Sequence, residues 1–129
     1  MPSKPQTRVL YVDYDDDSRE MLKLLLSISQ IDVTAVATAE SALSLIDAER
    51  FDMYLLDSWL ADTDGFELCR LMRKSHPNTP VLFFSGAAFE SDKRRGMEAG
   101  ASAYLCKPDL EGLLGSITQF VPHTHGVAA

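Results

Sequence analysis

The sequence predicts a doubly wound α/β domain, in which helices cover both faces of a five-stranded parallel sheet. Three observations support this fold class. Five short runs rich in Val, Leu and Phe alternate with longer stretches of helical spacing, which is typical of βαβ units. The runs are apolar almost throughout, as expected for strands covered on both faces. The length of 129 residues suits one domain, which we place at residues 8–121, between tails at 1–7 and 122–129.

The five apolar runs are the expected strands. In chain order they are Arg8–Val12, Val33–Ala37, Met53–Leu56, Val81–Phe84 and Ala103–Cys106. Parallel neighbours need a crossover connection, so a helix is expected after each strand. The first helix should begin near Asp16 or Asp17, because Asp17 and Glu20 have the spacing of a capping box. Its apolar face consists of Met21, Leu22, Leu25 and Leu26.

Four further helices complete the pattern. Thr38 can cap the second, and the segment "HPNTP" stops the third. Gly100 ends the fourth, which is short and polar. The four are expected over residues 39–49, 65–74, 90–100 and 109–121.

Charge and composition exclude several classes of function. A net charge of −7 argues against nucleic acid or an anionic membrane as the main partner. No run reaches the ~18 to 20 apolar residues that span a bilayer, and "MPSKPQTR" lacks the apolar core of a signal peptide. Cys69 and Cys106 match no metal-ligand spacing and are expected to be reduced thiols. We therefore expect a cytoplasmic protein without membrane insertion.

Polar residues whose side chains can take part in a reaction follow four of the five strands. Asp13 and Asp15 come after the first, Asp57 after the third, Ser85 after the fourth and Lys107 after the fifth. In an open parallel sheet, functional groups collect at the carboxyl ends of the strands. The sequence therefore predicts one pocket that contains carboxylates, a hydroxyl and an ammonium group.

This set of groups suits phosphoryl chemistry. Two carboxylates about 4 Å apart repel by roughly 4 kcal/mol at an effective dielectric near 20, so the cluster requires a cation. Mg²⁺ fits carboxylates, waters and an incoming phosphate. A carboxylate beside Mg²⁺, Lys107 and the Ser85 hydroxyl is equipped to attack a phosphoryl group and form an acyl phosphate.

Four segments carry a resemblance to a known family: "VLYVDYDDDSREMLKLLL", "FDMYLLDSWLADTDGFELCRLMR", "VLFFSG" and "AGASAYLCKP". Because these segments have the order and spacing found in that family, the chain from Arg8 to about Val121 resembles the receiver domain of two-component response regulators. The resemblance implies a flavodoxin-like, chemotaxis-regulator-like fold with strand order 2-1-3-4-5. It also implies a role in bacterial phosphorelay signalling rather than an enzyme, with only self-phosphorylation and slow autodephosphorylation.

The resemblance also implies residue roles. Asp57 would be phosphorylated by a sensor histidine kinase or a phosphotransfer protein. Asp13, Asp57 and the backbone carbonyl of Trp59 would bind Mg²⁺. Lys107 would pair with the phosphoryl group, ahead of a cis Pro108.

A switch pair is implied as well. Ser85 and Tyr104 match the family's hydroxyl and aromatic switch residues, and Gly86 joins the phosphoryl-binding set. The phosphorylated arrangement is favoured by its difference in contacts from the resting one. A downstream effector protein would then bind the face formed by the fourth helix, fifth strand and fifth helix.

Tyr14 departs from the family pattern, which usually has a second acid at this position. A phenol with a pKa near 10 is a poor ligand for a hard cation. Loss of a supporting group typically lowers metal affinity by ~10 to 100-fold, and loss of a direct ligand should be no gentler. Asp15 is one residue further along and is a candidate replacement.

Two hypotheses follow from this departure. The chain is either a working receiver with weakened Mg²⁺ binding, or a degenerate receiver that docks on its partner without phosphorylation. We favour the first, because Asp57, Ser85 and Lys107 are all present. Ala61, where the family usually has proline, is expected mainly to loosen the loop after Asp57.

Two rival classes share parts of the pattern. Asp13 and Asp15 read as the DxD of haloacid-dehalogenase-like phosphatases, with Asp13 as the nucleophile. That reading leaves Asp57 unexplained, and no acidic pair follows Lys107 in a further strand. A flavodoxin-like cofactor binder is disfavoured, because acids after the first strand would repel a flavin phosphate.

Overall fold

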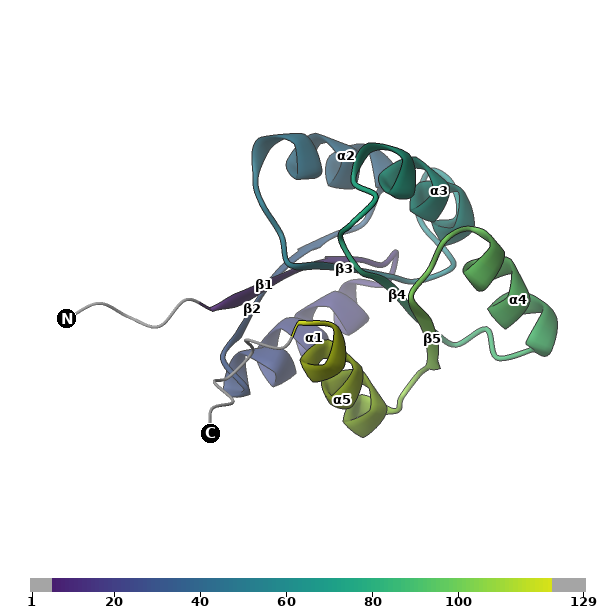
Figure 1. Cartoon of the computed structure of the whole chain (residues 1–129). Coiled ribbons are helices and arrows are strands. Elements are labelled where there is room, and N and C mark those ends of the chain that lie inside the picture. The colour runs from purple at the N-terminus through teal and green to yellow at the C-terminus, as the bar shows by residue number, and fades with distance from the viewer. Residues whose placement is uncertain (1–5, 122–129) are drawn as a thin grey trace.

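The computed structural model describes residues 6–121, which form a parallel sheet with helices on both faces (Figure 1). The strands are β1 (Thr7–Val12), β2 (Ile31–Val36), β3 (Met53–Leu56), β4 (Val81–Ser85) and β5 (Ala103–Cys106). The helices are α1 (Asp16–Ile28), α2 (Ala39–Ala48), α3 (Gly65–Ser75), α4 (Glu90–Glu98) and α5 (Leu110–Phe120). The strand order is β2-β1-β3-β4-β5, which confirms the prediction.

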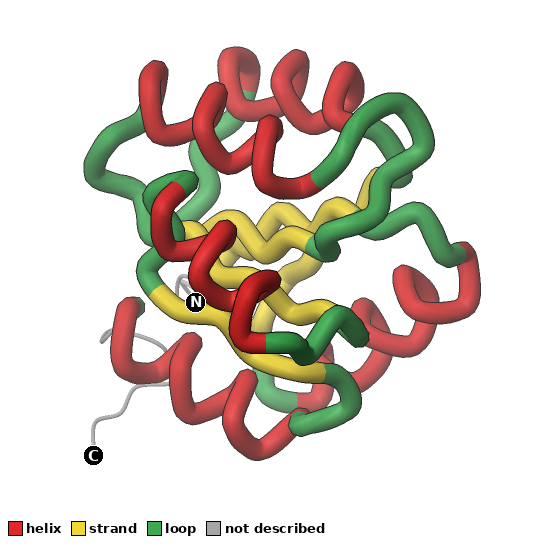
Figure 2. Tube along the Cα trace, turned by 90° about the vertical axis from the view of Figure 1, so that its right-hand side faces the viewer, coloured by secondary structure: helices red, strands yellow, loops and turns green. Residues whose placement is uncertain are grey.

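The helices form two layers. α2, α3 and α4 lie on one face of the sheet, and α1 and α5 lie on the other (Figure 1). Figure 2 shows the strands enclosed between these layers. Within residues 6–121, no helix has both the length and the apolar content to cross a membrane. The predicted tails fall mostly outside the described residues, and β1 begins at Thr7, one residue before the predicted start of the domain.

The strand boundaries agree with the prediction to within two residues. β3 and β5 match the prediction, whereas β4 extends by one residue to Ser85. The prediction for β2 was wrong at both ends. The strand ends at Val36 rather than Ala37, and it begins at Ile31 rather than Val33, because Asp32 interrupts the apolar pattern used to place its start. β2 is an edge strand and Asp32 is exposed, so a charged residue is tolerated there.

Helix α1 begins at Asp16, as predicted, but its capping residue differs from the prediction. Its cap is Asp15, not Asp17: the Asp15 carboxylate accepts hydrogen bonds from the backbone N–H of Ser18 at 2.9 Å and from its hydroxyl at 2.8 Å. Asp17 instead lies in the first turn, where a negative charge is favourable beside the helix dipole. Of the predicted apolar face, Leu22 and Leu26 are buried, whereas Met21 is exposed.

The other caps follow the sequence more closely. Thr38 caps α2 through a 3.0 Å bond from the Ser41 N–H, as predicted. Asp64 caps α3 in the same way through the Glu67 N–H at 2.8 Å. Gly100 adopts a φ of 109° just after α4, which confirms it as the residue that ends this helix.

Alternate residues of each strand supply two separate cores. In β1, Leu10 and Val12 pack under α2 and α3, while Val9 and Tyr11 pack against α1 and α5. Both faces of the sheet are therefore apolar, which explains why the strands read as continuous hydrophobic runs. The polar side chains of the candidate site lie at the carboxyl ends of the strands.

Candidate functional site

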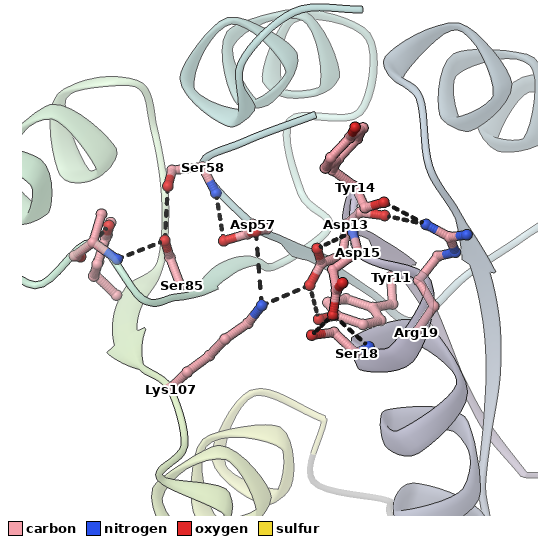
Figure 3. Close-up of polar contacts among 12 residues, drawn as sticks. Tyr11, Asp13, Tyr14, Asp15, Ser18, Arg19, Asp57, Ser58, Ser85 and Lys107 are labelled. Atoms are coloured by element: carbon pink, nitrogen blue, oxygen red, sulfur yellow. Dashed lines mark hydrogen bonds and ion pairs between the residues drawn. The ribbon is translucent and has the colours of Figure 1, made fainter. Parts of the chain in front are cut away.

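The carboxyl ends of four neighbouring strands meet at one pocket (Figure 3). Asp13 follows β1, Asp57 follows β3, Ser85 ends β4 and Lys107 follows β5. The ammonium nitrogen Nζ of Lys107 lies 2.7 Å from Oδ2 of Asp13 and 3.7 Å from Oδ2 of Asp57. The structure thus brings together groups that the sequence placed on separate segments. The peptide bond between Lys107 and Pro108 is cis, as the resemblance implies.

Asp13 is fully buried and both of its carboxylate oxygens are engaged. Oδ1 accepts a 2.9 Å hydrogen bond from the backbone N–H of Asp15. Oδ2 accepts from Lys107 and from the hydroxyl of Tyr11. Because charge-assisted hydrogen bonds hold it on both sides, Asp13 is a fixed negative charge rather than a mobile group.

Tyr11 is a part of the site that the sequence analysis missed. Burial raises the pKa of its phenol, and the hydrogen bond to Asp13 acts in the same direction, so the hydroxyl stays protonated and donates. The sequence did contain an indication that Tyr11 lies in the site. Residues two apart in a strand point to the same face, which places Tyr11 on the same side as Asp13.

Asp57 is also buried but is held less completely. Its Oδ1 accepts a 2.9 Å bond from the backbone N–H of Ser58, and its Oδ2 faces Lys107. Burial and the charge of Asp13 raise the pKa of Asp57, while Lys107 and the Ser85 hydroxyl oppose that rise. A carboxylate oxygen with one distant cation is a suitable nucleophile.

The backbone around Asp57 is positioned by helix α3. A Cβ atom at Gly65 would lie only 2.1 Å from the carbonyl oxygen of Asp57, so a side chain there would displace the strand end. The Gly65 N–H donates to the Ser58 carbonyl at 3.0 Å. Trp59 pairs with Asp64 in a short antiparallel bridge, and its side chain is exposed.

Ser85 lies fully buried beside a second hydroxyl that the sequence analysis missed. The Oγ atoms of Ser85 and Ser58 are 2.7 Å apart, and the backbone N–H of Ala87 donates to the Ser85 hydroxyl at 3.1 Å. Ser58 could have been noticed as a small hydroxyl directly after Asp57. Its buried position, however, depends on how β3 and β4 pair.

Tyr104 lies on the other side of Ser85, under helix α4. Its hydroxyl donates to the Ala87 carbonyl at 2.7 Å, and its ring stacks on Phe83 with centroids 5.3 Å apart. A Cβ atom at Gly96 would lie 2.7 Å from this ring, so the bare glycine makes room for it. Gly86 is exposed, and a side chain there would meet open space.

Tyr14 projects away from Lys107 in Figure 3 and is 63% exposed. Its backbone carbonyl and that of Asp13 accept hydrogen bonds from Arg19, at 3.0 and 2.7 Å. Arg19, which the sequence analysis missed, also pairs with Asp16 and so fastens the loop. The carboxylate of Asp15, the candidate replacement ligand, is engaged by α1 as its cap.

The loop after Asp57 is tied down at Ala61. We expected this residue to loosen the loop, but its backbone N–H donates to the Ala37 carbonyl at 3.2 Å. A proline has no N–H and could not make this bond. The Asp62 carboxylate adds bonds to the N–H groups of Ala39 and Glu40, at 2.8 and 3.1 Å. The loop is therefore fastened to the start of α2.

The donor set of the pocket fits Mg²⁺. Asp13 and Asp57 supply two carboxylates against the single ammonium of Lys107, and an excess negative charge favours a cation. Within residues 6–121 no cluster of three or more His, Cys, Asp or Glu side chains could hold a metal ion. Mg²⁺ commonly binds through one or two carboxylates and keeps several waters. The residues therefore suit a water-rich ion rather than an all-protein cage.

Comparison with known proteins identifies the same family throughout. Residues 9–118 match the family model described as "Response regulator receiver domain". The chain is 41% identical over 103 residues to the transcriptional regulatory protein CseB of Streptomyces coelicolor, covering 80% of this chain and 44% of CseB. It is 35% identical over 118 residues to the response regulator MprA of Mycolicibacterium vanbaalenii, covering 91% and 51%.

Solved structures show the same architecture. The receiver domain of response regulator 1452 from Francisella superposes with a TM-score of 0.85 at 28% identity, covering 92% of this chain and 99% of that one. The BeF3-activated DrrB receiver domain gives a TM-score of 0.82 at 28% identity, covering 92% and 100%. The chain spans about half the length of the curated relatives that it matches.

Proposed function

The chain belongs to the response regulator receiver domain family, and from this premise we propose that Asp57 accepts a phosphoryl group in two-component signal transduction. The observation that carries the proposal is the arrangement of Asp13, Asp57 and Lys107. Two buried carboxylates share one ammonium group, and Asp57 has the less engaged oxygen.

The proposed reaction is a displacement at phosphorus. Oδ2 of Asp57 attacks the phosphoryl group, the bond between phosphorus and the donor's leaving atom breaks, and an acyl phosphate forms on Asp57. Mg²⁺, held by Asp13, Asp57 and the Trp59 carbonyl, would supply positive charge to the phosphoryl oxygens. Because Lys107 already lies between the two carboxylates, its ammonium can pair with a phosphoryl oxygen after a small movement.

Ser85 and Tyr104 would change their contacts when Asp57 is phosphorylated. The Ser85 hydroxyl donates to a phosphoryl oxygen, and Tyr104 responds through the Ala87 segment that both residues contact. The affected surface is the face of α4, β5 and α5, where a downstream effector would bind. Response regulators interact with sensor kinases and effectors, and the phosphodonor would be a sensor histidine kinase or a phosphotransfer protein. As is typical of response regulators, this step would take place in the cytoplasm.

Tyr14 supports a second candidate, a receiver that docks on its partner without phosphorylation. The side chain that the family uses as an acid is here an exposed phenol, and Asp15 is occupied as a helix cap. The phosphatase alternative is weaker. Its nucleophile would be Asp13, whose two oxygens are already bound by Tyr11, Lys107 and the Asp15 N–H.

Intact-mass spectrometry separates these functions. The protein is incubated with acetyl phosphate over a range of Mg²⁺ concentrations, and we expect one phosphoryl group per chain. Uptake should require more Mg²⁺ than in a receiver with the usual acid pair. A folded protein that takes up no phosphate at any Mg²⁺ concentration would support the docking module. Continuous release of phosphate from a phosphomonoester would support the phosphatase.

A further inference from the structure

Two buried hydroxyls face each other beside the phosphoacceptor. Ser58 follows Asp57 at the end of β3, and Ser85 ends the neighbouring strand β4. Their Oγ atoms are 2.7 Å apart, and the two side chains point toward each other in Figure 3. Because both residues are buried, each hydroxyl must find its hydrogen-bond partners inside the protein.

The hydrogen bonds of Ser85 can be counted. A hydroxyl has one proton to donate and two lone pairs that accept. The N–H of Ala87 occupies one lone pair of Ser85 at 3.1 Å. If Ser58 donates to the second lone pair, both are filled and the proton of Ser85 is free to point at a third group.

The third group is Asp57. Burial and the charge of Asp13 raise the pKa of Asp57, and the Ser85 hydroxyl is among the groups that oppose this rise by hydrogen bonding. Under the proposed function, the Ser85 hydroxyl donates its proton to the group that Asp57 carries at the end of the neighbouring strand β3. With the proton assigned in this way and one lone pair of Ser85 occupied by the Ala87 N–H, we assign the bond between the two hydroxyls as running from Ser58 to Ser85.

We propose that Ser58 is a positioning residue, whose hydroxyl donates to Ser85 and so aims the Ser85 proton at the group carried by Asp57. The inference rests on the proposed function and adds a residue to it. Before phosphorylation the chain of hydrogen bonds ends on the carboxylate, and after it the chain ends on a phosphoryl oxygen. Donation from Ser58 polarises Ser85 and strengthens its bond to the anion.

A double-mutant cycle tests this role. Initial rates of phosphoryl uptake from acetyl phosphate at saturating Mg²⁺ are compared for wild type, Ser58→Ala, Ser85→Ala and the double variant. We expect Ser58→Ala to slow uptake about three- to tenfold, the range for one neutral hydrogen bond. In the Ser85→Ala background the same change should have no further effect, because its target hydroxyl is gone.

Two further variants separate positioning from packing. Ser58→Thr keeps a hydroxyl and should restore uptake to near the wild-type rate. Ser58→Cys keeps the volume with a much weaker donor and should resemble Ser58→Ala. Thermal unfolding by circular dichroism confirms that each variant is folded.

The outcomes distinguish this inference from the proposed function. If wild type takes up no phosphate, the proposed function and the inference both fail. If wild type is phosphorylated but Ser58→Ala is unchanged, or slows uptake equally with and without Ser85, only the role of Ser58 is overturned.

Discussion

The two ends of the sheet both gather acids and bases, but they hold them in different ways. At the carboxyl end, Asp13 is 0% exposed and Asp57 is 8% exposed, and a single ammonium lies between them. At the amino end, Arg8 pairs with Glu49 and Asp32, whose side chains are 41% and 52% exposed. Solvent screens the second set, so its ion pairs contribute little to stability or reactivity.

Cavity volume does not indicate which end of the sheet carries the proposed site. A groove of about 540 Å³ lies at the amino end, lined by residues that include Asp47, Phe51, Tyr54 and His76. The groups proposed to react, Asp13, Asp57 and Lys107, lie instead at the carboxyl end. Opposed charges removed from water, rather than volume or the number of acids, distinguish the end of the sheet that carries the proposed site. Four predictions test that contrast.

The largest effect is expected for Asp57→Asn. An amide is not a nucleophile for phosphorus, so uptake from acetyl phosphate should be lost entirely. Asp47→Asn is the matched control, because it makes the same change at the exposed acid beside the amino-end groove. Intact-mass spectrometry measures both, and residual phosphorylation of Asp57→Asn would mean that another residue is the acceptor.

A large effect on folding is expected for Lys107→Met. This change leaves two buried carboxylates without their ammonium, and removal of one partner of a buried pair costs about 3 kcal/mol of unfolding free energy. At the amino end, Glu49→Gln breaks an exposed pair and should cost less than about 1 kcal/mol. Urea unfolding at pH 7 without Mg²⁺ compares them. Equal losses at both ends would show that burial does not distinguish the two sets of charges.

Tyr14→Asp should tighten Mg²⁺ binding by ~10 to 100-fold, because it adds a carboxylate beside Asp13. Trp59, the only tryptophan, lies two residues after Asp57 and provides a fluorescence signal for the titration. In wild type we expect a saturable change in fluorescence, with a Kd for Mg²⁺ above the millimolar range. Tyr14→Phe is the control and should gain nothing. If Tyr14→Asp binds no better than wild type, another group already supplies the missing ligand.

The smallest effect concerns pH. Burial and the charge of Asp13 raise the pKa of Asp57 above its ordinary 3.8. At a pH between 3.8 and this raised pKa, the native state therefore holds more protons than the unfolded state. Metal-free stability should therefore fall as pH rises through this window. Asp57→Asn should flatten that part of the profile, whereas Asp47→Asn should leave it in place. Urea unfolding from pH 4 upward in a chelating buffer measures the profile, and a slope unchanged in Asp57→Asn would assign it elsewhere.

The fold was predictable because its signals are local and repeated. Apolar runs separated by helical stretches specified the parallel sheet, and Thr38 and Gly100 marked helix ends that the structure has. The errors lie where two local signals compete. Asp15 and Asp17 both lie near the start of α1, and only the extended backbone at Asp15 makes it the cap.

The site was predictable at the level of segments but not of contacts. Asp13, Asp57 and Lys107 could be placed together because strand ends converge in this topology. Tyr11 and Ser58 were missed, since their parts depend on which way side chains point between paired strands. The hydrogen bond from the Ala61 N–H to the Ala37 carbonyl could not be predicted either, because the partner of a backbone N–H in a loop depends on how the chain folds.

Gly96 gives helix α4 an unusual way of resting on the sheet. It is the buried position of this helix, and it offers backbone rather than a side chain to the ring of Tyr104. The height of the helix above β5 is therefore fixed by the thickness of an aromatic ring that belongs to another segment. A movement of the Tyr104 ring would remove the group on which α4 rests, so a change at one side chain would shift the whole exposed face of this helix.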